Sequence, residues 1–232
     1  MRIGAVIPCA GRGLRMGPGD PKQFLELEGK PIIAWAAERL QSSPVIESIV
    51  IAAPGDQIEL MKRIVSDHRL SKVCAIVAGG ARRQDSVRNG LRALNEESAG
   101  LVLIHDGVRP FVDPAIIESL LAELSQADAA IVGVRAKDTI KLSDGERIVR
   151  SSPSRDAVWI AQTPQLFRRS DLCAAFERAE SDHFSGTDEA TLIERLGKRV
   201  AIVEGSYDNI KVTTPEDLEL ARIIARRKQV SV

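Results

Sequence analysis

The feature that most constrains this chain is a glycine-rich turn directly after an apolar segment near its start. Residues 3–7 carry only apolar side chains or glycine, which is typical of a parallel strand buried on both faces. The turn that follows contains Gly11, Gly13 and Gly17. Because glycine has no side chain, backbone N–H groups there can approach an anion closely and donate to it. The sequence therefore predicts an open α/β sheet with a phosphate-binding loop after its first strand.

Two cationic residues on this loop, Arg15 and Lys22, favour a polyphosphate as the ligand. The dinucleotide motif G-x-G-x-x-G would need a glycine where Met16 stands. The P-loop motif is excluded because neither Gly-Lys-Ser nor Gly-Lys-Thr occurs in the chain. The loop therefore belongs to neither of these two common classes of nucleotide-binding protein.

The length of the chain indicates one domain, residues 1–232. Its composition argues against a protein that binds nucleic acid or a membrane. Lys+Arg and Asp+Glu both number 32, and aromatic residues make up 3%, so there is neither a basic field nor a stacking surface for nucleic acid. With no apolar stretch long enough to span a bilayer and no signal peptide, we expect a cytoplasmic protein with no membrane partner. The three scattered cysteines fit a reducing compartment. One of them, Cys9, is interpreted as a small buried residue rather than a nucleophile.

Strand and helix patterns alternate along the chain and predict a Rossmann-like, mostly parallel sheet with helices on both faces. Apolar segments predict strands at residues 45–53, 73–77, 101–104, 129–134 and 200–203, and an edge segment at 207–213. Helical periodicity marks residues 31–40, 56–65, 114–124, 168–179, 187–196 and 215–226, and a further helix carries Val87, Leu91 and Leu94. At residues 187–196 we expect Thr187 to be the N-cap.

Residues 137–155 interrupt this alternation and predict a protruding β-hairpin arm around Asp144-Gly145. The arm has one apolar stripe, formed by Ile140, Leu142, Ile148 and Val149. Because a lone hairpin with so few apolar residues is not stable in water, we expect the arm to pack on a second copy of the chain in a homodimer.

Two further places in the sequence are candidate ligand sites. Gly79-Gly80 opens a helix and, with Arg83 and Ser86, predicts a second anion site. Asp106 follows the strand at 101–104, at the sheet edge where α/β proteins bind ligands. Beside a triphosphate, its carboxylate would suit Mg²⁺ or a ribose hydroxyl.

Seven motifs occur in an order that closely resembles the 2-C-methyl-D-erythritol 4-phosphate cytidylyltransferase family. They are Ala10-Gly11-Arg12-Gly13-Leu14-Arg15-Met16-Gly17, Pro21-Lys22-Gln23, Gly79-Gly80 with Arg83 to Val87, His105-Asp106 with Arg109-Pro110, Gln162-Thr163-Pro164-Gln165, Thr187-Asp188-Glu189, and Asp208-Asn209-Ile210-Lys211-Val212-Thr213. The resemblance implies a fold of the nucleotide-diphospho-sugar transferase type. It also implies that CTP and 2-C-methyl-D-erythritol 4-phosphate are joined to give 4-diphosphocytidyl-2-C-methyl-D-erythritol and pyrophosphate.

The resemblance also implies roles for individual residues. Arg15 and Lys22 would stabilise the pentacoordinate phosphate, and Arg155 and Lys211 would hold the attacking phosphate. Mg²⁺ bound with the triphosphate would contact Asp106, or less favourably Asp208. The expected nucleotide contacts are Ala10, Gly11, Gly13, Gly80, Arg83, Ser86, Asp106 and Gly107, and the expected acceptor contacts are Arg109, Thr163, Thr187 and Asp208.

The sequence departs from the family pattern in two places and leaves two alternative functions open. Gly107-Val108 stands where relatives usually have Ala-Ala, and Ala81 where an Asp is common. Ribitol-5-phosphate cytidylyltransferase shares much of the pattern, but the loop here reads Pro-Cys-Ala-Gly rather than Leu-Ala-Gly-Gly. A non-catalytic nucleotide-binding regulator is the other alternative, and it would not need the second pair of cations.

Overall fold

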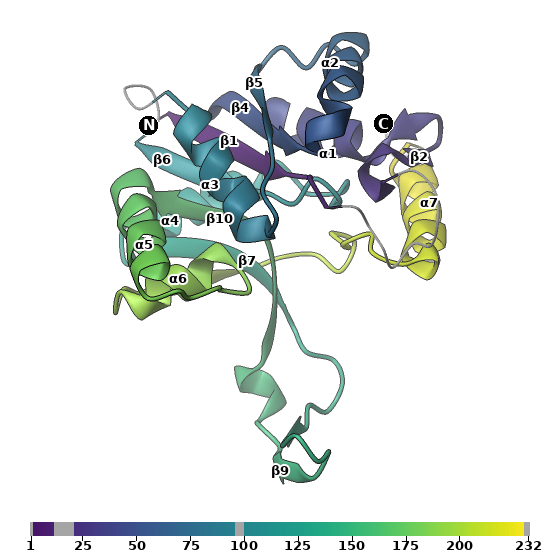
Figure 1. Ribbon diagram of the computed structural model, residues 1–232. Coiled ribbons are helices and arrows are strands. Elements are labelled where there is room, and N and C mark those ends of the chain that lie inside the picture. The colour runs from purple at the N-terminus through teal and green to yellow at the C-terminus, as the bar shows by residue number, and fades with distance from the viewer. Residues whose placement is uncertain (1, 12–20, 96–99, 230–232) are drawn as a thin grey trace.

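The fold is built on one seven-stranded sheet with the strand order β11-β7-β10-β6-β1-β4-β5. The computed structural model describes residues 2–11, 21–95 and 100–229. The strands are β1 (Ile3–Pro8), β4 (Ile46–Ala53), β5 (Val73–Ala78), β6 (Leu101–Ile104), β7 (Ala129–Arg135), β10 (Trp159–Arg168) and β11 (Val200–Glu204). This arrangement confirms the predicted α/β fold with a mostly parallel sheet (Figure 1).

The strand β10 runs against its two neighbours, β6 and β7, whereas the other strand pairs in this sheet are parallel. The chain leaves the sheet at the end of β7, forms the arm, and re-enters through β10 at the same edge. A chain that returns at the edge from which it left must run backwards, because a parallel return needs a crossover.

Helices cover both faces of the sheet, as predicted. One layer holds α1 (Ile32–Gln41), α2 (Ile58–Asp67) and α4 (Ile116–Glu123), and the other holds α3 (Arg83–Ala93), α5 (Arg169–Ser181) and α6 (Glu189–Arg195). The side chains of Ile3, Ala5 and Ile7 in β1 pack in the first layer, and that of Val6 packs in the second. This alternation is the two-residue period of a strand that is buried on both faces.

A third apolar cluster lies at one end of the sheet, around the last helix, α7 (Pro215–Gln229). This helix packs Ala221 and Ala225 against Trp35 of α1 and against Leu27. Leu27 belongs to a short hairpin, β2 (Glu26–Leu27) and β3 (Lys30–Pro31), which the sequence patterns did not indicate. Through this cluster, the β2–β3 hairpin packs against α7.

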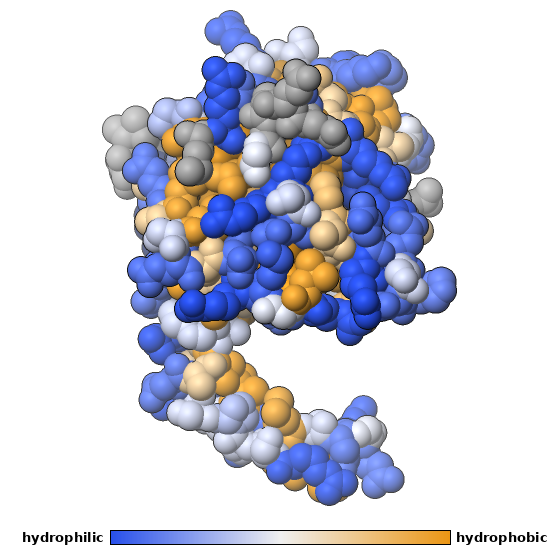
Figure 2. Space-filling model, turned by 90° about the vertical axis from the view of Figure 1, so that its left-hand side faces the viewer, coloured by the Kyte–Doolittle hydropathy of each residue, from blue (hydrophilic) through white to orange (hydrophobic). Residues whose placement is uncertain are grey.

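The arm projects away from the sheet, as Figure 1 shows, but its strands are shorter than predicted. They are β8 (Leu142–Ser143) and β9 (Val149–Ser151), joined by a wide turn. The side chain of Asp144 accepts hydrogen bonds from the backbone N–H groups of Glu146 and Ile148 at 2.9 and 3.0 Å. Arg147 has a positive φ of 64°. These contacts make residues 146–148 part of the turn. Apolar side chains gather on the surface of the arm (Figure 2).

Two local predictions are wrong. Residues 207–213 do not form an edge strand but an irregular segment, because the buried Asn209 bonds to Gln162 and to the backbone of Thr163. The helix α6 is capped by Asp188 rather than Thr187, since the Asp188 carboxylate accepts from the N–H of Thr191 at 3.0 Å. None of the described helices is long and apolar enough to cross a membrane.

Candidate active site

A cavity of about 810 Å³ lies at the carboxyl end of β1, on the predicted side of the sheet. Its walls come from the first glycine loop, the 3₁₀ helix η2 (Lys22–Phe24), the turn before α3, the residues after β6, and the segment after β11. The predicted residues that line it are Ala10, Gly11, Lys22, Gly80, Arg83, Ser86, Asp106 and Lys211. The topology therefore brings together side chains from both ends of the chain.

The second glycine turn packs tightly on the first turn of α3. A Cβ atom on Gly80 would lie 2.3 Å from the Cβ of Asp85, closer than two carbons can approach. The N–H of Gly80 donates to the Oγ of Ser86 at 3.1 Å, and the Ser86 hydroxyl donates to the Arg82 carbonyl at 3.2 Å. Ser86 thus holds the shape of the turn, and glycine is required at position 80.

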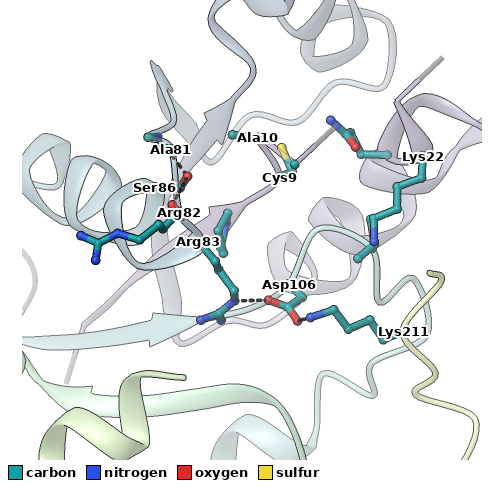
Figure 3. A pocket seen from close by; sticks show the side chains of 14 residues that line it. Cys9, Ala10, Lys22, Ala81, Arg82, Arg83, Ser86, Asp106 and Lys211 are labelled. Carbon is teal, nitrogen blue, oxygen red and sulfur yellow. Dashed lines mark hydrogen bonds and ion pairs between the residues drawn. The ribbon is translucent and has the colours of Figure 1, made fainter. Parts of the chain in front are cut away.

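Three charged side chains, Arg83, Asp106 and Lys211, lie in a row along the cavity wall, as Figure 3 shows. The Nε of Arg83 donates to Oδ1 of Asp106 at 2.9 Å, and Lys211 Nζ lies 2.8 Å from Oδ2. Burial opposes the charge on Asp106, but Arg83 and Lys211 outweigh it and hold the pKa of this carboxyl well below its ordinary value. Asp106 therefore stays ionised and fixes both cations.

A smaller cavity of about 210 Å³ adjoins this row and shares it as a wall. Arg83, Asp106 and Lys211 line both cavities. The smaller one also contains the predicted acceptor residues Arg109, Thr163 and Thr187. Two ligands that occupied the two cavities would meet at a wall that carries two cations and one carboxylate.

A buried chain of hydrogen bonds holds Asp106 in place from behind. The N–H of Asp106 donates to the hydroxyl of Thr163 at 3.0 Å, and that hydroxyl lies 3.0 Å from Nδ1 of His105. The other ring nitrogen, Nε2, lies 3.0 Å from the carbonyl of Arg109, which can only accept. Nε2 therefore carries a proton and donates to this carbonyl. Burial lowers the pKa of His105 to about 4, so at neutral pH the ring carries this proton alone and Nδ1 accepts from the Thr163 hydroxyl.

Other predicted site residues lie elsewhere. Gly13 and Arg15 fall outside the described residues. Arg155 is exposed in the 3₁₀ helix η4 (Arg155–Ala157) at the base of the arm, where its Nη1 donates to the Lys137 carbonyl at 3.1 Å. Asp208 forms an ion pair with Arg227 of α7 and is not among the residues that line the two cavities.

Gly107 and Cys9 lie beside the larger cavity in tight packing. A Cβ on Gly107 would lie 2.8 Å from both the Cβ of Cys9 and the Cδ1 of Ile33, so a larger residue here would require these neighbours to move. Burial raises the pKa of the Cys9 thiol far above its ordinary value, and the residue is 5% exposed. Cys9 is thus a packing residue, as predicted.

The sequence patterns did not reveal Glu189 and Asn209 as parts of the site. Glu189 belongs to the Thr187-Asp188-Glu189 motif but has no predicted role of its own, yet its side chain is buried and binds Arg83. The side chain of Arg109 donates to the backbone carbonyl of Asn209 at 2.7 Å. The available signal was their position inside short polar motifs next to predicted site residues.

No group of three or more His, Cys, Asp or Glu side chains within the described ranges is arranged to hold a metal ion. The site consists instead of cations from several elements around a large cavity, with a smaller polar cavity behind them. Together with the mostly parallel sheet, this arrangement is that of an α/β nucleotide-dependent transferase.

Comparison with known proteins identifies the family. The model of the family IspD: 2-C-methyl-D-erythritol 4-phosphate cytidylyltransferase matches residues 3–227. A cytidylyltransferase of this description from Geobacter metallireducens is 47% identical over 232 residues, or 98% of this chain and 99% of the relative. Another from Syntrophotalea carbinolica is 48% identical over 224 residues, or 96% and 95% of the two chains.

A solved structure with a similar fold supports the same family. The crystal structure of 4-diphosphocytidyl-2C-methyl-D-erythritol synthase from Anaerococcus prevotii is similar with a TM-score of 0.85 and 31% identity, over 97% of this chain and 96% of that one. The chain belongs to the 2-C-methyl-D-erythritol 4-phosphate cytidylyltransferase family and is a nucleotidyltransferase.

Proposed function

We propose that this protein transfers a cytidylyl group from CTP to 2-C-methyl-D-erythritol 4-phosphate and releases pyrophosphate. The observation that carries the proposal is the shared wall of Arg83, Asp106 and Lys211 between the two cavities. CTP would occupy the larger cavity, and the polyol phosphate would occupy the smaller one. Their phosphates would then meet at the cationic wall.

Charge neutralisation and positioning account for the chemistry. An oxygen of the acceptor phosphate attacks the α-phosphorus of CTP in line, and the bond to pyrophosphate breaks. The attacking oxygen is already anionic, so no general base is required. Lys22 lines the larger cavity and would, with Arg15, stabilise the charge that develops on the α-phosphate. Lys211, with Arg155, would hold the acceptor phosphate, as the family pattern implies.

Mg²⁺ fits the site only as a companion of the nucleotide phosphates. Among the carboxylates of the described ranges, Asp106 alone lines both cavities, and one protein oxygen suffices for Mg²⁺ held mainly by phosphates and water. Asp208 does not fit this role, because it pairs with Arg227 on α7. When bound, Mg²⁺ would reduce the charge repulsion between the triphosphate and the incoming anion.

We also propose a cytoplasmic homodimer in which the arm supplies Arg155 to the partner's site. The arm exposes Leu142, Ile148 and Val149 by 52%, 56% and 54% of their surfaces, which would be unfavourable in a monomer. Arg155 is exposed at the base of this arm rather than lining the cavities of its own chain. The three cysteines are all free, in keeping with a reducing compartment.

A pyrophosphate-release assay tests the proposal. We expect CTP and 2-C-methyl-D-erythritol 4-phosphate to give rapid release, whereas ribitol 5-phosphate and a control without acceptor do not. UTP in place of CTP should be a poor substrate, because a site built on hydrogen bonds to one base leaves groups unpaired with another. Preference for ribitol 5-phosphate would assign the chain to that acceptor instead. Tight CTP binding without turnover on either acceptor would indicate a regulator.

A further inference from the structure

We propose that Glu189 is a positioning residue for nucleotide binding, which acts by fixing the guanidinium of Arg83 in the wall between the two cavities. This inference rests on the proposed function, because it assigns CTP to the larger cavity. It concerns a residue that touches neither cavity itself and whose effect passes through Arg83.

The contact between Glu189 and Arg83 is direct and buried. Nη1 of Arg83 donates to both carboxylate oxygens of Glu189, at 2.9 and 2.7 Å. The side chain of Glu189 is 1% exposed, whereas that of Arg83 is 28% exposed and reaches the cavities. Glu189 is therefore the buried anchor of the pair, and Arg83 is its ligand-facing end.

The two carboxylates divide the donors of Arg83 between them. Nε donates to Asp106 and Nη1 donates to Glu189. Within the described part of the chain, the N–H groups on Nη2 have no protein partner, so they remain for a ligand. A guanidinium is planar and rigid, so fixing Nε and Nη1 also fixes the direction in which Nη2 donates.

The anchor itself is held rigidly. Glu189 is the first residue of α6, and the preceding Asp188 is the N-cap of that helix. Oδ1 of Asp188 makes the cap bond to the helix, and Oδ2 accepts from Nε2 of Gln165, in β10, at 2.8 Å. Glu189 is thus tied to the central sheet through its neighbour, which is the kind of support that a precisely held site requires.

The cost of burying Glu189 also argues for a positioning role. Burial raises the pKa of Glu189, against the attraction of Arg83. A buried ion pair contributes little net stability compared with apolar side chains of the same size, whereas loss of one partner is costly. Without Glu189, Asp106 would be the one carboxylate left to Arg83 among the described residues, and Lys211 already donates to that carboxylate at 2.8 Å.

The test is a double-mutant cycle measured by calorimetric binding of CTP without acceptor. We expect Glu189→Gln and Arg83→Gln each to weaken CTP binding about tenfold, and the double variant to bind no more weakly than Arg83→Gln alone. Glu194→Gln, an exposed acid on the same helix, is the control and should bind CTP as the wild type does. Glu189→Asp keeps the charge but shortens the reach, so it should give a smaller loss.

The outcomes separate this inference from the proposed function. Wild-type protein that does not bind CTP would overturn the proposed function, whatever Glu189 does. If the wild type binds CTP and folded Glu189→Gln binds it equally well, Glu189 does not position Arg83. A tenfold loss that persists in the Arg83→Gln background would show that Glu189 acts on the fold and not through Arg83. If Glu189→Gln does not fold, Glu189→Asp and the double variant, in which two amides face each other, decide the question by the same criteria.

Discussion

The body of the molecule, which is the seven-stranded sheet with its helices, and the arm at residues 137–155 differ in where their apolar side chains lie. In the body, the apolar residues of β1 are fully buried, and polar side chains bond across long stretches of sequence, as Arg83 does with Glu189. In the arm, the polar contacts are local, such as Lys141 with Ser152, and the apolar side chains face outward. The contacts of β1 are thus internal to the body, whereas the arm leaves large apolar side chains on its surface, where we propose that a second copy of the chain packs.

This difference divides the proposed site into two parts. The nucleotide cavity and its cationic wall belong to the body and are held by buried contacts. Arg155 belongs to the arm and is set apart from both cavities of its own chain. Substitutions in the body should therefore damage a subunit's own site, whereas substitutions in the arm should damage association and the site of its partner.

The largest effect is expected for Lys22→Ala in the body. Lys22 lines the larger cavity and would interact most strongly as charge develops on the α-phosphate. Loss of one such contact is worth about 3 kcal/mol, or at least a hundredfold in kcat. Steady-state kinetics with CTP would measure this, with Lys62→Ala on α2 as the control, since Lys62 is exposed and pairs with Glu59. Equal losses of CTP affinity and kcat would contradict the role in the transition state.

The second prediction concerns the buried hydrogen bonds of His105 behind Asp106, and it is that the stability of the protein depends on pH. Burial lowers the pKa of His105 in the folded protein from its ordinary value of 6.5 to about 4. Between these values the unfolded chain binds a proton that the folded protein does not, so stability falls as the pH drops from 6.5 toward 4. The contribution of His105 to this loss is roughly 3 kcal/mol, because a tenfold change in proton affinity corresponds to about 1.4 kcal/mol.

Chemical denaturation at pH 7 and pH 4 would measure this contribution. The His105→Gln variant should be less stable at pH 7, because the contacts to Thr163 and Arg109 change, but it should lose less stability on acidification. If wild type and variant lose the same free energy of unfolding between the two pH values, His105 is not held neutral in the fold.

A smaller effect is expected for Ile148→Asp in the arm. Ile148 is 56% exposed, and its burial between two copies would contribute about 2 kcal/mol per copy. The charged variant should therefore shift the protein from dimer to monomer in sedimentation, with an unchanged melting temperature of the body at low concentration. Glu146→Gln in the same turn is the control, because Glu146 is already exposed and polar. A dimer that survives Ile148→Asp would remove the arm from the interface.

The smallest expected effect is a partial recovery of activity in mixed dimers, which tests whether Arg155 of one subunit acts in the site of the other. When Lys22→Ala and Arg155→Ala proteins exchange subunits, half of the dimers are mixed, and each mixed dimer has one intact site of two. Activity should then recover to about a quarter of the wild-type value. Subunit exchange would be verified by mass spectrometry. Exchange without recovery would place Arg155 in the site of its own chain.

Local sequence patterns were sufficient for much of this molecule. The apolar run of β1 and the glycine turns predicted the type of sheet and the edge at which the cavity lies, because strand period and glycine geometry are local properties. The same reasoning failed where two neighbouring residues offer the same chemistry. Both Thr187 and Asp188 are good helix caps, and only the packing of α6 selected Asp188. The arm strands were predicted too long because the bonds of Asp144 to its turn are not visible in an alternating pattern.

What the sequence alone determined was which residues carry charge and which segments are buried. What only the tertiary structure decided was which charge meets which. Arg83 and Glu189 are separated by 106 residues, and so no periodicity links them. Asn209 lies in a segment whose pattern suggested an edge strand, yet its buried amide bonds to Gln162 and Thr163. The physical reason is that strand and helix patterns reflect the local backbone, whereas a buried charge or amide must find its partner wherever the packed chain brings one within reach.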